Sequence, residues 1–129
     1  MFKETISHAG DRPVVLMDSV SSVTAQDAGS IVVSASHGGT SSGEFATRHR
    51  LGGCFFNDAG VGKDDAGIAA LGMLDEMQVA GATLSHFSAC IGDARDHWAH
   101  GVVSHVNRTA AAAGLAPGQS VRDAVRHLA

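Results

Sequence analysis

Short apolar runs, each closed by a loop of glycine and polar residues, constrain the fold of this 129-residue sequence more than any other feature. Runs of this length and composition are typical of buried strands. After the third run, Ile68, Leu71 and Leu74 recur at helical spacing. Strands that alternate with helices form mainly parallel sheets, because parallel neighbours need a crossover connection. The four predicted strands are residues 13–17, 31–35, 51–56 and 82–87.

We therefore expect residues 1–129 to form a single-domain α/β fold, a three-layer sandwich around a mainly parallel sheet of four to five strands. The fifth strand is residues 101–106, a segment that also fits a continuation of the preceding helix. Further helices are expected where capping residues precede helix-forming segments. They cover residues 41–49, 93–100, 109–113 and 120–128.

The balance of charged residues disfavours nucleic acid as a partner. The chain has 9 Lys and Arg against 13 Asp and Glu, a formal net charge of −4, and no basic run. No apolar run approaches the roughly 20 residues of a membrane span, and the first residues lack the pattern of a secretory signal. We therefore expect a cytoplasmic protein with no membrane partner, in which both cysteines are thiols.

Three polar loops are expected to meet at one edge of the sheet. They follow the second, third and fourth predicted strands and span residues 34–40, 57–64 and 88–93. Each combines glycine with hydroxyl, amide, carboxylate, imidazole or thiol groups. Ligands of open parallel sheets bind outside the carboxyl ends of the strands, so these loops predict a site for a small anionic metabolite.

The first loop supplies the residue to which we assign proton transfer. His37 follows a buried strand, and an imidazole can titrate near neutral pH. Asp58 or Asp93 would orient that imidazole or act as a partner base if the neighbouring strands lie side by side. In the competing interpretation, His37 caps the following helix, Asp58 is a turn residue and Asp93 is a helix cap.

The predicted ligand-binding groups are small or polar residues of the first two loops. Glycines let a ligand approach the main-chain amides, and Lys63, unless it is simply solvated, can neutralise an anion. No phosphate-loop or dinucleotide-binding motif is complete. The pair of His97 and His100 has Asp93 and Asp96 one turn upstream but no accompanying metal-binding motif, so we expect neither a cofactor nor a metal. The ligand-binding set is Ser36, Gly38, Gly39, Thr40, Asn57, Gly60, Gly62 and Lys63.

Cys90 indicates a second possible chemistry. It ends the segment Ser88-Ala89-Cys90 after one predicted strand, whereas His37-Gly38 follows another. This order of strand, His-Gly, strand and Ala-Cys resembles that of caspase-like cysteine peptidases. The resemblance covers only these two segments and implies that Cys90 is a nucleophile activated by His37. The alternative is that Cys90 is packed in the core, as free cysteines often are.

The leading functional hypothesis is a small cytosolic α/β enzyme that performs hydrolysis, elimination or isomerisation by acid/base chemistry. The alternatives are a non-catalytic metabolite-binding or subunit module, and a cysteine hydrolase that uses a pair of His37 and Cys90. We also expect a homo-oligomer, because segment 109–113 and the stripe of Val121, Val125 and Leu128 offer faces to a partner. In the competing interpretation both faces cover the sheet within one chain.

Overall fold

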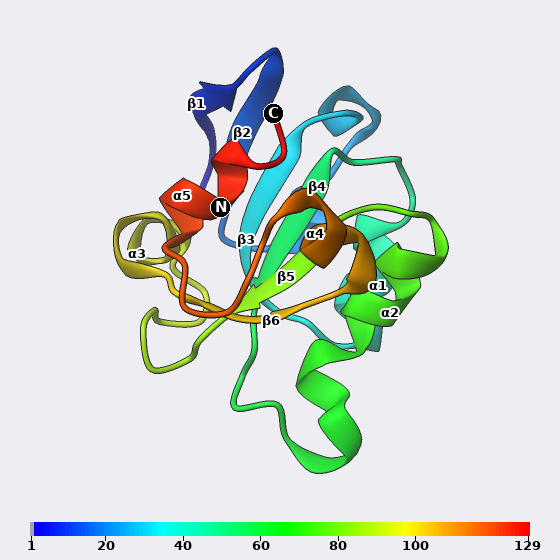
Figure 1. Ribbon diagram of the computed structural model, residues 1–129, viewed down its shortest axis with the longest axis vertical. Helices are drawn as coiled ribbons and strands as arrows, with labels where there is room; N and C mark the ends of the chain where they lie inside the picture. The colour runs from blue at the N-terminus through cyan, green and yellow to red at the C-terminus, as the bar shows by residue number, and fades with distance from the viewer. Residues whose placement is uncertain (1) are drawn as a thin grey trace.

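The computed structural model describes residues 2–129 and contains one six-stranded sheet (Figure 1). Strands that are neighbours in the sheet are also neighbours in the sequence, in the order β1-β2-β3-β4-β5-β6. Strands β2 to β5 pair in parallel, whereas β1 and β6 pair antiparallel at the two edges. The strands are β1 (Lys3–Ala9), β2 (Arg12–Met17), β3 (Ile31–His37), β4 (Gly53–Asn57), β5 (Gly81–Leu84) and β6 (Val103–Val106).

The α/β class is confirmed, but the expected sheet of four to five mainly parallel strands is wrong, because an antiparallel strand lies at each edge. Strand β1 carries no apolar alternation, since residues 3–8 are all exposed, and therefore no hydrophobic pattern marks it. It forms a hairpin with β2 through Gly10, whose φ of 60° suits glycine. The strand predicted at residues 101–106 is confirmed as β6.

Strand β6 runs antiparallel because the preceding helix does not return the chain to the opposite edge of the sheet. The chain leaves β5, forms α3 (Ala94–His100) and comes back beside Ser85, whose N–H donates to the Val102 carbonyl oxygen over 2.8 Å. Strand β6 therefore starts at the edge where β5 ends.

Helices cover both faces of the sheet. Helices α1 and α2 pack on one face together with the short 3-10 helix η1, and α3, α4 and α5 pack on the other. No helix within residues 2–129 is long and apolar enough to cross a membrane. The remaining helical segments are η1 (Val20–Ser22), η2 (Ala25–Asp27), α1 (Thr40–Ala46), η3 (Lys63–Ile68), α2 (Ala69–Glu76), α4 (Arg108–Ala113) and α5 (Val121–Arg126).

Successive strand residues point to opposite faces of the sheet, and this alternation divides the core in two. In β4, Phe55 packs with the face covered by α3, α4 and α5, and Phe56 packs with the face covered by α1 and α2. Both rings are fully buried. Central strands that are buried on both faces are continuous apolar runs in the sequence, which explains why β2 to β5 were predictable and β1 was not.

Candidate functional site

The carboxyl ends of three neighbouring parallel strands meet at one edge of the sheet. His37 at the end of β3 is paired with Asn57 at the end of β4, and Asn57 is paired with Leu84 at the end of β5. The connection from β4 to α2 projects from this edge as the green loop at the bottom of Figure 1. The three predicted polar loops therefore all start at the same edge.

Asp58 is the most strongly hydrogen-bonded carboxylate at this edge. Its side chain is only 6% exposed, and its Oδ1 accepts hydrogen bonds from the Gly60 N–H (2.9 Å), the His86 N–H (3.1 Å) and the His86 ring. Burial raises the pKa of this carboxyl, but the hydrogen bonds from Gly60, Ser104 and His86 outweigh burial and hold the pKa below its usual value. Asp58 is therefore a fixed negative charge.

His86 is the partner of this carboxylate. Its Nδ1 lies 2.9 Å from Asp58 Oδ1, and because a carboxylate only accepts, Nδ1 carries the proton and Nε2 keeps a lone pair in the neutral ring. The side chain is 40% exposed. A Cβ atom added to Gly60 would lie 3.8 Å from Nε2, in ordinary van der Waals contact, so Gly60 lies beside this nitrogen. His86 was not among the predicted site residues, because residues 82–87 were predicted as strand, whereas β5 ends at Leu84.

His37 has the opposite tautomer. Its Nδ1 accepts a hydrogen bond from the Gly39 N–H over 3.0 Å, so the neutral ring carries its proton on Nε2. The histidine lies on the wall of a cavity of about 380 Å³ between the end of β3 and the β4–α2 connection. The cavity is lined by His37, Gly39, Thr40, Ala59, Val61, Ala66 and Gly67.

Asn57 holds the loops of this edge together. Its Nδ2 donates to the Ala89 carbonyl oxygen (3.0 Å) and to Nε2 of His97 (3.2 Å), and its Oδ1 accepts from the Ala59 N–H (2.7 Å). The His97 ring is buried, donates from Nδ1 to the Asp93 carbonyl oxygen over 2.7 Å, and has a pKa lowered by burial. The amide predicted to bind a ligand is therefore fully engaged within the chain.

Asp93 and Cys90 lie on the loop after β5. Asp93 caps α3 by accepting from the Asp96 N–H, and the Cys90 N–H donates to the Asp96 carboxylate over 2.8 Å. Cys90 is exposed, so the expectation that it is packed in the core is wrong. Within the described part of the chain, no hydrogen bond or ion pair joins His37 to either residue. Strand β4 separates the strands that precede them.

The glycine amides expected to bind an anion are already engaged. The pair after β3 donates to a carbonyl oxygen of β4 over 3.1 Å and to the ring of His37. The pair after β4 donates within its own turn, over 2.9 and 2.7 Å. These four residues are Gly38, Gly39, Gly60 and Gly62.

The other three predicted ligand-binding side chains differ in their surroundings. Ser36 Oγ accepts from the Val20 N–H over 2.9 Å and so attaches η1 to the sheet. Thr40 lines the cavity beside His37. Lys63 is exposed at the start of η3. Thr40 and Lys63 are therefore the polar side chains of this set with room for a ligand.

Within residues 2–129, no three His, Cys, Asp or Glu side chains converge as a metal site requires. The fold and this edge define an α/β protein with a paired carboxylate and imidazole, and with a second imidazole that lines a cavity at the same edge of the sheet. Comparison of the chain with protein-family models, curated proteins and solved structures finds no match. The geometry of the carboxyl edge is therefore the basis for assigning a function.

Proposed function

We propose that the protein catalyses acid/base chemistry, of hydrolase, lyase or isomerase type, on a small anionic metabolite bound at the carboxyl edge of the sheet. The observation that carries the proposal is the 2.9 Å hydrogen bond between the buried Asp58 carboxylate and Nδ1 of His86. A carboxylate in this position fixes the tautomer of the imidazole and stabilises the ring once it has accepted a proton.

His86 and His37 take complementary roles in this proposal. Nε2 of His86 holds a lone pair and acts as the general base, whereas Nε2 of His37 carries a proton and acts as the general acid. Their strands, β5 and β3, are second neighbours in the sheet. Neighbouring strands are spaced by about 4.8 Å, so the main chains of these strands lie about 10 Å apart, and a substrate would have to span the end of β4 to reach both histidines.

The anionic group of the substrate is assigned to side chains, because the glycine amides of this edge are engaged within the chain. Lys63 supplies a positive charge on the same connection that forms one wall of the cavity, and the Thr40 hydroxyl lines the opposite wall. A positive charge at this edge would also raise the local concentration of an anionic substrate.

Solvent deuterium exchange tests this proposal even while the substrate and the product are unidentified. The protein is incubated in heavy water with mixtures of small carboxylates and phosphate esters, and mass spectrometry records deuterium uptake or a change of mass. General-base catalysis contributes about 100-fold to 10,000-fold, so His86→Gln should lose that factor and His37→Gln a similar one. His8→Gln, on the exposed edge strand β1, is the matched control and should retain the activity.

Turnover that is equal in His86→Gln and in the wild-type protein would remove the proposed base. The same experiment separates the catalyst from the non-catalytic metabolite-binding module, because a binding module retains its ligand unchanged. The cysteine hydrolase is the other alternative: Cys90 is exposed, as a nucleophile requires, but among the described residues no hydrogen bond joins it to His37. Rapid alkylation of Cys90 at neutral pH that is lost in His37→Gln would support that alternative.

A homo-oligomer and a cytoplasmic location are also proposals. Val121, Val125 and Leu128 are buried against the sheet, so this stripe is not free for a partner, whereas residues 111–113 of α4 are exposed. Self-association would therefore use the alanine face of α4. Light scattering at micromolar concentration tests it, and a mass of 13.1 kDa, that of one chain, would contradict it.

A further inference from the structure

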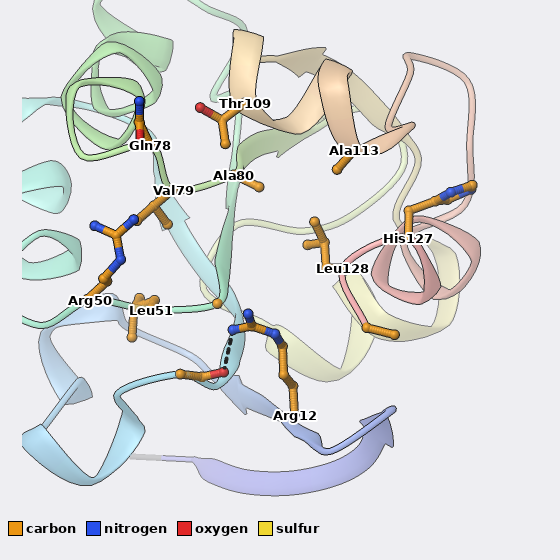
Figure 2. Close-up of a pocket in the computed structure, with 13 residues that line it drawn as sticks. Arg12, Arg50, Leu51, Gln78, Val79, Ala80, Thr109, Ala113, His127 and Leu128 are labelled. Carbon is orange, nitrogen blue, oxygen red and sulfur yellow. Dashed lines mark hydrogen bonds between the residues drawn. The ribbon is translucent and has the colours of Figure 1, made fainter.

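A second cavity lies at the opposite edge of the sheet, where the parallel strands begin (Figure 2). Its volume is about 400 Å³, and its walls are the segments that lead into β2, β3, β4 and β5, together with α4 and the last residues of the chain. The side chains of Arg12 and Arg50 extend into this space, and none of the 13 lining residues is Asp or Glu. The cavity therefore combines two positive charges with no neutralising side-chain carboxylate.

Arg12 is held in a fixed position on the floor of this cavity. Its Nη1 donates to the Gly29 carbonyl oxygen over 3.0 Å, the dashed line in Figure 2. A Cβ atom at Gly52 would collide with Nη1, so the guanidinium lies directly against the main chain of this glycine. One hydrogen bond and one close main-chain contact thus order the side chain and leave other N–H groups of the fork for a ligand.

Arg50 is attached to the same peptide segment through its main chain. Its carbonyl oxygen accepts from the Gly29 N–H over 2.9 Å, so Gly29 contacts the side chain of Arg12 and the main chain of Arg50. Among the residues that the structure describes, none forms a hydrogen bond or an ion pair with the Arg50 guanidinium. One guanidinium, that of Arg12, is therefore hydrogen-bonded to Gly29, and Arg50 contacts the same glycine through its main chain while its own guanidinium has no partner among the described residues.

We propose that this cavity binds a small molecule through a dianionic group, either a phosphate or a pair of carboxylates. Guanidinium groups match the oxygens of these anions with paired N–H donors, and none of the side chains that line the cavity is a carboxylate. This cavity is lined by two arginines although the formal net charge of the chain is −4. The site is distinct from the carboxyl edge and does not depend on the function proposed for that edge.

Titration of the isotope-labelled protein, followed by nuclear magnetic resonance, tests the proposal. Sodium phosphate and sodium malonate are added separately, and sodium chloride keeps the ionic strength constant. We expect saturable shifts of the Gly29 and Gly52 amide signals and of the arginine Nε–H signals with phosphate, malonate or both, and the anion that binds identifies the group. Arg50→Gln should weaken the affinity about tenfold or more, because it removes charge-assisted hydrogen bonds.

Two further variants sharpen the result. Arg95→Gln is the matched control, since the Arg95 guanidinium lies over the Phe2 ring, 4.2 Å from its centroid, and does not line the cavity. It should bind as the wild-type protein does. Arg12→Lys keeps the charge but removes the planar fork and should bind more weakly. Absence of shifts, shifts that sodium chloride reproduces, or an unchanged affinity in Arg50→Gln would overturn the proposal.

Discussion

Replacement of Asn57 by alanine should destabilise the protein more than its small change of volume would suggest. The amide makes three hydrogen bonds, to the Ala89 carbonyl oxygen, to the ring of His97 and to the Ala59 N–H, at 3.0, 3.2 and 2.7 Å. The variant Asn57→Ala removes all three at once. It also disconnects the turn after β4 from the loop after β5.

The expected change in the free energy of unfolding follows from the polar groups that lose their hydrogen-bond partner. Ala89 and His97 are buried, so two polar groups lose their partner where water does not readily replace it, whereas Ala59 is exposed and its N–H can be hydrated. An unsatisfied buried polar group costs about 1–3 kcal/mol, so the two together should lower the free energy of unfolding by about 4 kcal/mol. Domains of this size are stable by about 5–15 kcal/mol, so the variant should fold but unfold easily.

Urea denaturation followed by circular dichroism measures this change. Gln26→Ala is the control, since this amide is exposed in η2 and should change the free energy of unfolding by less than about 0.5 kcal/mol. If Asn57→Ala lowers the free energy of unfolding by less than about 1 kcal/mol, water or a rearranged side chain satisfies the two groups and the reasoning is refuted.

Three further predictions concern protonation, thiol reactivity and packing. Burial lowers the pKa of His97, so below pH 6.5 the unfolded chain binds a proton that the folded chain does not, and the free energy of unfolding should fall by up to about 1.4 kcal/mol per pH unit. Urea denaturation that gives equal stability at about pH 7.5 and about pH 5.5 would contradict this. Burial raises the pKa of the Cys54 thiol, so a chromogenic disulfide reagent should react only with Cys90 in the native protein and with both thiols in denaturant. Two reactive thiols in the native protein would be inconsistent with the burial of Cys54. Gly38→Ala would place a Cβ atom 2.6 Å from the Gly67 carbonyl oxygen and should lower the melting temperature, whereas Gly72→Ala, within α2 and with open space around it, should raise it slightly. The reverse order would show that the main chain near Gly38 can move away from the added Cβ atom.

The central strands were predictable because they are buried on both faces. Strands β2, β3 and β4 end within two residues of the prediction, whereas β5 ends at Leu84 and not at residue 87. Strand β1 was not, since an edge strand exposed on both sides needs only main-chain hydrogen bonds to β2, which leave no mark on the side-chain pattern. The direction of β6 also depends on where α3 ends in space, which local sequence does not specify.

The candidate site was predictable as a region more than as a set of roles. The sequence places His37 and Asp58 at strand ends. The pairing of Asp58 with His86 depends on the pairing of β4 with β5 and on the turn after β5, which brings the imidazole to Asp58. Polar residues in loops serve ligands and loop geometry equally well. Asn57 and the glycine amides turned out to hold the loops, and only their hydrogen-bond partners reveal this.

The order in which the two faces of the sheet are covered has a consequence for biosynthesis. The face against α1 and α2 is covered by connections that lie between the parallel strands, whereas the cover of the other face is formed mainly by residues after β5. When only the residues up to β5 have left the ribosome, the sheet of the nascent chain therefore has one apolar face that no helix covers. Such a nascent chain is a natural client for a holdase chaperone, and a stalled or truncated product would be prone to aggregation and degradation.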